Sequence, residues 1–518
     1  MRKWLPLMAI CAGTFMLLVD VTIVNVALPA LAASLHTSFS SLQWVVDAYA
    51  LTLAALVLGI GSVADRIGHR RVFIAGLVVF AASSLACGFA TGAGLLIGAR
   101  AVQGAGGAAM FATTFPLLNS SYSGRDRGTA YGMWGAVAGA AAAVGPVLGG
   151  LLTQEASWRW IFFVNPPVSV GVIALAWMLA GNDEPARGRV DGPGILTLTA
   201  AAAAATYAMI RAGSYGWAAA GTWGLLAAAA GLLGAFALIE WRTADPMLDL
   251  RLLRSRVFTG MILAGLTLNF AAFAYLTYTS IWLQSVLRMS PIDAGLATMP
   301  LSLVAFAVAG GSGRALHNAR PGRVIGIGLI LIGAGGLISM VLVRGAAGWP
   351  QLIAGFAVVG VGVGLVSPML GSATMASVPR ERAGMAAGAV NMMRQLGFAF
   401  GVALLGTVFA ARAARSLAGR GVPGSDVLAR ELAGGQAQAA VHAAGSHRGV
   451  VSSALHAASV AGLQGSFLVA GLGGIVTGLL VLALVRQPRS HPAAVRTGRE
   501  ATPASSVAGS VAPAAAEH

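Results

Sequence analysis

Several charged side chains lie inside long apolar runs of this sequence. Asp20 lies about fifteen residues into the first run, and Arg100 lies about seven residues into the fourth. A carboxylate at the centre of a bilayer costs about 2.5–3.5 kcal/mol on insertion scales. An arginine stays charged there and therefore needs a partner. Asp20 is a candidate proton carrier or counter-charge for a cationic ligand, with Arg100 able to tune it; a purely structural ion pair is the alternative.

Two further charged residues leave more than one interpretation open. Asp47 lies near the outer end of the second run, where it is either a second protonatable site or a residue that faces the membrane interface. Arg394 stands with Asn391 and Gln395 in the thirteenth run. This polar cluster could bind a substrate, or it could serve helix packing near the inner face.

The amino-acid composition of the chain indicates whether water or lipid surrounds these residues. Of the 518 residues, 57% are hydrophobic and only 10% are charged, and the mean hydropathy is +0.79. A soluble domain carries about 25% charged residues, so lipid must solvate most of this chain. We find no series of short alternating strands of about ten residues, which a transmembrane β-barrel would require.

The elements that carry the charged residues are expected to be transmembrane helices. A bilayer core about 30 Å thick needs about 20 helical residues, and the apolar runs have this length. The sequence predicts an all-α polytopic membrane protein with fourteen transmembrane helices at 5–30, 44–64, 72–91, 93–118, 131–154, 160–181, 193–212, 217–240, 257–286, 291–312, 321–343, 351–376, 384–411 and 462–485.

The distribution of positive charge orients these helices. Most of the 33 Lys and Arg fall in the segments that are cytoplasmic if the N-terminus is cytoplasmic, as the positive-inside rule requires. This topology explains the net charge of +16 better than nucleic-acid binding does. Both termini are therefore expected in the cytoplasm, and residues 412–461 are expected to form one long outer loop. The Ala/Pro/Ser-rich tail 487–518 is expected to be disordered.

Two short, basic, glycine-bearing inner loops suggest a duplicated six-helix unit. They are Gly61–Arg71 and the degenerate segment Gly311–Arg323, where Arg314 stands roughly in the place of Asp65. Internal repeats of this kind build transporters whose halves rock about a central site. The sequence predicts six-helix bundles at 1–185 and 246–486, two pseudo-symmetric halves separated by an inserted helix pair at 186–245.

Six motifs together resemble the major facilitator superfamily, and in particular its fourteen-span drug:proton antiporter branch. The segments are the loop Gly61–Arg71, the intramembrane stretch Arg100–Gly106, the antiporter-type stretch Gly139–Gly150, and the stretches Asp20–Pro29, Trp158–Pro166 and Asn391–Gly397. They cover most of the chain in the order that the family would require. His69 departs from the pattern, because a basic residue is usual at that position.

The resemblance implies a proton-coupled exporter of small, lipophilic molecules (drugs, antibiotics or metabolites) that works by alternating access and needs no cofactor beyond the proton gradient. It implies a monomer in the bacterial cell (inner) membrane. It also assigns roles to residues of this chain: proton coupling to Asp20, Arg100 and Asp47; a cytoplasmic gate to Gly61, Asp65, Arg66, Gly68, Arg70 and Arg71; and the antiporter motif to Gly139, Gly145, Pro146, Gly149 and Gly150. Asn25, Gln103, Asn391 and Arg394 are candidate residues of a substrate cavity.

Other classes of protein fit less well. The only lysine is Lys3, so the chain has no Gly-Lys-Ser/Thr phosphate loop and is not expected to be an ATP-driven pump. Polar residues within the predicted helices are too few and scattered for a catalytic centre or a metal site. Two alternatives on the same scaffold stay open: a proton-coupled uptake or metabolite carrier, and a transport-dead membrane sensor.

Overall fold

The computed structural model describes residues 2–37, 39–177, 191–243, 246, 248–315, 319–345, 347–378, 383–438, 441 and 448–485, and within these residues the chain is helical without strands. The predicted all-α membrane fold is confirmed. The tail 487–518, which was expected to be disordered, lies outside the described residues.

The helices fall into a first set, an inserted pair and a second set. The first helix set comprises α1 Leu5–Leu35, α2 Phe39–Ile67, α3 His69–Gly88, α4 Ala93–Ser121, α5 Gly124–Glu155, α6 Trp160–Phe163 and α7 Asn165–Trp177. The inserted pair comprises α8 Gly192–Tyr215 and α9 Ala220–Arg242. The second helix set comprises α10 Arg256–Ala272, α11 Leu276–Ile281, α12 Pro291–Ala315, α13 Pro321–Leu342, α14 Leu352–Ala376, α15 Ala383–Ala418, α16 Ser425–Ala433 and α18 Arg448–Leu484. Short turns are η1 Arg2–Trp4, η2 Leu250–Arg254, η3 Trp282–Val286 and η4 Trp349–Gln351.

These helices have the length that a bilayer demands. Among the described residues, thirteen helical segments are long and apolar enough to cross a membrane. Helix α8 is not among these thirteen, but its 24 residues extend about 36 Å at 1.5 Å per residue, which is long enough to cross the bilayer. In lipid every backbone N–H and C=O must be satisfied within the protein, and an α-helix does this within one segment.

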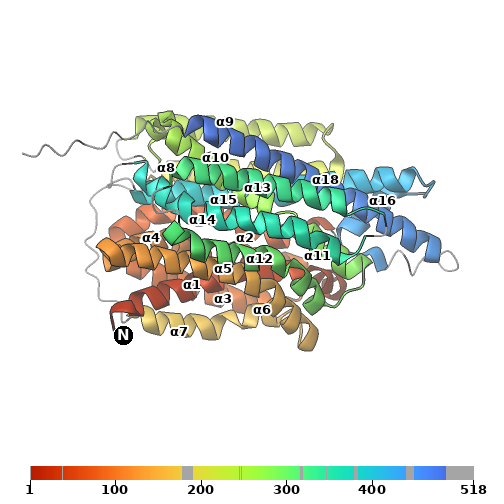
Figure 1. Cartoon of the computed structure of the whole chain (residues 1–518), viewed down its shortest axis with the longest axis horizontal. Helices are drawn as coiled ribbons and strands as arrows, with labels where there is room; N and C mark the ends of the chain where they lie inside the picture. The colour runs from red at the N-terminus through yellow and green to blue at the C-terminus, as the bar shows by residue number, and fades with distance from the viewer. Residues whose placement is uncertain are drawn as a thin grey trace, which may run out of the picture. The chain divides into compact units, whose positions relative to one another are not determined.

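Figure 1 shows the two helix sets side by side with nearly parallel helices, red to yellow for the first and green to blue for the second. Helices α5 and α12 pack together along this boundary, as do α2 and α15. Helix α8 packs against both α2 and α15, and α9 packs against α8. The inserted pair therefore lies against the side of the boundary that α2 and α15 form.

The two ends of the bundle are named here by the residues they contain. Following the expected topology, the end with the start of α1 and Gly68 is called the inner end, and the end with the turn from α1 to α2 and the helix α16 is called the outer end. Gln436, just after α16, donates a hydrogen bond from Nε2 to the carbonyl of Thr37 at 3.1 Å, which joins α16 to that turn.

The outer segment 412–461 is not one long loop, and that expectation was wrong. Helix α15 continues to Ala418, α16 occupies Ser425–Ala433, and α18 begins at Arg448. Alanine is the strongest helix former, and this segment is rich in it. The helices extend beyond the apolar runs because arginine, which lowers hydropathy sharply, is nearly as good a helix former as leucine.

Candidate functional site

Asp20 and Arg100 form a buried ion pair between α1 and α4. Arg100 Nη1 lies 2.5 Å from Asp20 Oδ2, and each residue is 1% exposed. Arg100 is also held on α2: its Nε donates to the Val45 carbonyl at 3.1 Å, and its guanidinium lies 4.2 Å from the centre of the Tyr49 ring. Asp20 and Arg100 therefore lie close together, and α2 also holds Arg100 in place.

Amide and hydroxyl groups complete the surroundings of the Asp20 carboxylate. Gln103 Nε2 donates to Asp20 Oδ1 at 2.9 Å, and Asn165 Nδ2 donates to the same oxygen at 3.2 Å. Both amides also donate to Ser84 Oγ, at 3.2 and 2.9 Å. The cluster of Asp20, Arg100, Gln103, Asn165 and Ser84, called the Asp20 cluster below, thus draws on α1, α3, α4 and α7.

Asn165 and Ser84 were not among the residues predicted from the sequence, although Asn165 lies in one of the six motifs. A local signal existed: the Asn165-Pro-Pro sequence interrupts the sixth span, and the structure divides that span into α6 and α7 at Val164. The structure also places Gln103, expected in the substrate cavity, in the Asp20 cluster; Gln103 is 0% exposed.

Asp47 is buried without a polar partner. It is 0% exposed, and neither carboxylate oxygen has a hydrogen bond to a described residue. Gln43, one helical turn earlier on α2, donates from Nε2 to the Tyr278 hydroxyl of the second helix set at 3.4 Å. Asp47 therefore does not face the membrane interface, which was one of its two interpretations.

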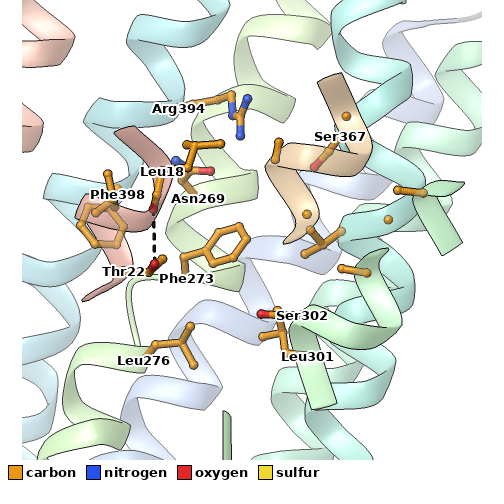
Figure 2. A pocket seen from close by; sticks show the side chains of 18 of the residues that line it. Leu18, Thr22, Asn269, Phe273, Leu276, Leu301, Ser302, Ser367, Arg394 and Phe398 are labelled. Atoms are coloured by element: carbon orange, nitrogen blue, oxygen red, sulfur yellow. Dashed lines mark hydrogen bonds between the residues drawn. The ribbon is translucent and has the colours of Figure 1, made fainter. Parts of the chain in front are cut away.

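A hollow lies between the two helix sets, and is called the central pocket (Figure 2). Polar and aromatic residues line it from both sets: Thr22, Asn25, Phe111, Trp134, Asn269, Phe273, Ser302, Ser367, Arg394, Gln395 and Phe398. Asn25 and Arg394 thus lie where the sequence placed a cavity. Asn25 Oδ1 also accepts a hydrogen bond from Thr277 Oγ1 at 3.2 Å.

A smaller hollow continues the central pocket towards the inner end. The two share Trp134, Ser367 and Arg394. The smaller hollow adds Asn391 and Thr374 to the lining, and these lie in the inner parts of α15 and α14. Three of the four candidate cavity residues therefore line one connected space, and Gln103 does not.

Helix α1 connects the Asp20 cluster to the central pocket. Leu18, Val21 and Thr22, which flank Asp20 in the sequence, line the pocket. Asp20 itself is bonded to α4 and α7. The proton-binding candidate and the pocket wall are therefore on different faces of the same helical turn.

The glycines of the antiporter-type stretch lie where α5 meets α1 and α12. A Cβ on Gly145 would collide with Thr22 Oγ1, and one on Gly149 would lie 2.8 Å from the Ile23 carbonyl oxygen. A Cβ on Gly150 would lie 2.5 Å from the Pro291 carbonyl oxygen. A Cβ on Gly139 would meet the Phe306 Cα at 3.4 Å. Gly145 and Gly149 thus permit close packing of α5 against α1 within the first helix set, and Gly139 and Gly150 permit close packing of α5 against α12 across the boundary between the sets.

Other contacts also join the two sets towards the outer end. Gln284 Nε2 donates to the Val26 carbonyl at 2.9 Å. Pro146 lies against Gly295, where a Cβ would come within 2.6 Å of the Pro146 carbonyl oxygen. The outer part of the boundary is therefore closed in this conformation.

The residues of the expected cytoplasmic gate lie at the inner end. Asp65 Oδ1 is 3.3 Å from His69 Nε2, and the Asp65 side chain is 56% exposed. Arg70 Nη2 donates to the Trp177 carbonyl at 2.5 Å, within the first helix set. Gly68 has a φ of 106°, a conformation that favours glycine, and it forms the turn between α2 and α3. The side chain of Arg314 lies outside the described residues.

Comparison with known proteins identifies relatives over nearly the whole chain. The profile of the Major Facilitator Superfamily matches residues 10–402. The tetracenomycin C resistance and export protein of Streptomyces glaucescens is 30% identical over 492 residues, which cover 93% of this chain and 91% of that protein. The puromycin resistance protein of Streptomyces alboniger is 37% identical over 438 residues, which cover 81% and 84% of the two chains.

A solved structure has the same fold. The crystal structure of the human organic anion transporter MFSD10 aligns with a TM-score of 0.58, covering 92% of this chain and 99% of that chain. At 14% sequence identity, this similarity concerns the arrangement of helices alone.

Proposed function

The chain belongs to the major facilitator superfamily and is a multi-pass membrane transporter of the drug-efflux type, not an enzyme, and we propose that protons entering at Asp20 drive the export. The observation that supports this proposal is the Asp20 cluster: a buried carboxylate held by one arginine and two amides. Relatives named for resistance to tetracenomycin C and puromycin support small lipophilic antibiotics as substrates.

The ion pair provides a means of coupling. When Asp20 is ionised, it holds Arg100 and so links α1 to α4; a proton on Asp20 removes the charge that Arg100 pairs with. Arg100 would then keep its contacts to Val45 and Tyr49 on α2. Because Leu18 and Thr22 of α1 line the central pocket, a shift of α1 would change the pocket. Proton and substrate would thus favour different positions of one helix, which is the requirement for coupling two sites.

The glycine-rich contacts and the inner loop suggest how access alternates. Gly139 and Gly150 of α5 pack against α12 and support closure of the boundary, while Gly145 and Gly149 pack α5 against α1. We propose that the inner part is latched, when the outer part opens, by Gly61, Asp65, Arg66, Gly68, Arg70 and Arg71. In the present conformation Asp65 pairs with His69. The cycle would exchange this pair for contacts with the second helix set. The six-helix halves 1–185 and 246–486 would rock about the pocket, with the pair 186–245 at their side.

The proposed setting is the cell (inner) membrane of a bacterium, with both termini in the cytoplasm and a single chain as the working unit. Its partners would be the lipid bilayer, protons and the small-molecule substrate. The positive-inside distribution of Lys and Arg supports this orientation.

Proton release from inside-out vesicles tests the direction of transport. The lumen is acidified, and an internal pH dye is followed while lipophilic drugs and dyes are added outside. Export in exchange for protons should raise the luminal pH in a compound-dependent way. An uptake symporter would carry protons inwards with the compound and lower the luminal pH. A transport-dead sensor would give no signal with any compound, although folded protein is present.

Asp47 is the proposed second proton site, and its replacement should change the number of protons exchanged per substrate molecule. An unpaired carboxylate is costly to bury, so a proton on Asp47 stabilises the present arrangement. We expect Asp47→Asn to fold and export, but to exchange fewer protons per substrate, which lowers the steady-state accumulation of substrate at a fixed pH gradient. The measurement is luminal substrate against imposed ΔpH; an unchanged dependence would assign Asp47 a packing role.

A further inference from the structure

Resting on the proposed export function, the geometry points to amphipathic aromatic anions as the preferred ligands of the central pocket, and we propose that Arg394 binds their acidic group. The acidic group would be a carboxylate or an ionised phenol. The inference concerns the charge of the substrate, which the Asp20 cluster leaves undetermined.

The wall of the central pocket carries an unbalanced positive charge. Among the described residues that line the central pocket and its inner continuation, Arg394 alone is charged. The ion pairs of the described residues are Lys3 with Asp126, His69 with Asp65, and Arg100 with Asp20. Arg394 takes part in none of them. The wall therefore carries one positive charge with no acid to balance it.

The position of Arg394 makes this charge costly without a ligand. It lies eleven residues after the start of α15, about 16 Å along the helix, and hence deep in the membrane. Its Nε is buried and has no hydrogen-bond partner among the described residues. Figure 2 shows the guanidinium group projecting into the space between Asn269 and Ser367. An unpaired charge in such a site is destabilising unless a counter-charge is supplied, and a bound anion supplies one.

The side-chain oxygen of Asn269 is a second polar atom of the pocket wall that could bind the ligand, in addition to the Arg394 guanidinium. Asn269 Oδ1 is buried and accepts no hydrogen bond from a described residue, whereas its Nδ2 donates to Gln395 Oε1 at 3.4 Å. A ligand that presents a hydroxyl or N–H group near its acidic group would satisfy both Asn269 and Arg394. Buried polar groups of this kind contribute specificity because leaving them unpaired is unfavourable.

The remainder of the pocket is suited to an aromatic body. Phe111, Trp134, Phe273 and Phe398 contribute rings to the wall. Cationic ligands would meet Arg394 and no carboxylate, because Asp20 is bonded to Arg100 and the amides around it.

Two xanthene dyes of similar size but opposite charge test the proposal. The purified protein in detergent is titrated with fluorescein, an anion that carries a carboxylate and a phenolate, and with rhodamine 6G, a cation. Fluorescence polarisation gives each Kd, with empty micelles as the blank. We expect fluorescein to bind about tenfold more tightly, and Arg394→Gln to weaken fluorescein about tenfold while leaving rhodamine 6G unchanged or tighter. Arg394→Lys should restore part of the fluorescein affinity.

The controls separate a role in binding from a role in folding. Arg412→Gln removes an exposed arginine from the same helix and should leave both Kd values unchanged. Equal weakening of both dyes by Arg394→Gln, tighter binding of rhodamine 6G to the wild type, or binding of neither dye would overturn the proposal. If Arg394→Gln fails to fold, the Kd values of the two dyes for the wild type and for Arg394→Lys still test the proposal. Binding needs no proton gradient, so failure of proton coupling would leave the dye preference intact.

Discussion

Asp20→Asn should abolish proton-driven export while the protein still folds and still binds and exchanges substrate. Asparagine has nearly the shape of the protonated carboxyl, a state that the proposed cycle already visits. Arg100 would keep the Val45 carbonyl, Gln103 Oε1 and the Tyr49 ring as partners. We expect compound-dependent alkalinisation of inside-out vesicles to fall about 100-fold, the upper range of coupling between two binding sites. Exchange of labelled for unlabelled substrate without a gradient should persist.

The matched control for this variant is Asp126→Asn. Asp126 pairs with Lys3 on the surface, and exposed pairs of this kind contribute little, so proton-driven export should be unchanged. If alkalinisation survives in Asp20→Asn, the proton carrier is a different residue, and Asp47 becomes the main candidate. If Asp20→Asn loses exchange as well as coupling, the Asp20 cluster is required for substrate binding or for the structure.

The pairing of Asp20 with Arg100 could be predicted because burying a charge in the membrane is costly, so charged residues inside apolar runs are few and easily recognised in the sequence. Two opposite charges at comparable membrane depth have few other partners. Asn165 and Ser84 carry no charge, so nothing in the local pattern distinguished them from other polar residues. Gln103 follows Arg100 by three residues, and i,i+3 neighbours share a helix face; this spacing would have placed it beside Asp20 rather than in the cavity.

The fold was predictable to the extent that hydropathy determines it. Apolar runs located the fourteen spans, because lipid selects apolar segments of fixed length. Hydropathy could not place the ends of α15 and α18, which run past the apolar runs as alanine-rich helices. The sequence marked Asn25 and Arg394 but not the central pocket as a whole, because its wall is assembled from α1, α4, α5, α10, α11, α12, α14 and α15. Arg394 was recognised as polar, but only the structure shows that it lacks a partner.

Gly150→Ala should prevent closure of the outer part and so stop transport. The new methyl group would lie 2.5 Å from the Pro291 carbonyl oxygen and 2.7 Å from the Ile292 Cα. These are backbone atoms of α12, which cannot move aside as a side chain can. Overpacking of this kind costs about 1–3 kcal/mol, which the protein can avoid by separating α5 from α12. We therefore expect the outward-open state to accumulate and export to fall by roughly tenfold or more.

A reporter cysteine measures the expected shift. Thr298, which is 7% exposed and lines a separate small hollow together with Asn25 and Pro146, is replaced by cysteine. A membrane-impermeant maleimide should label Thr298→Cys faster in the Gly150→Ala background than in the wild type.

Gly132→Ala provides the matched control on the same helix. A Cβ at Gly132 meets nothing within 4 Å, so labelling and export should both be unchanged there. Should Gly150→Ala fail to fold, Gly139→Ala is the milder substitution at the same α5–α12 contact, because its methyl group would approach the Phe306 Cα only to 3.4 Å. Unchanged labelling together with unchanged export in both variants would show that close packing of α5 is not what closes the outer part. Lost export without increased labelling would instead indicate that these glycines are needed for the transition between conformations and not for closure of the outer part.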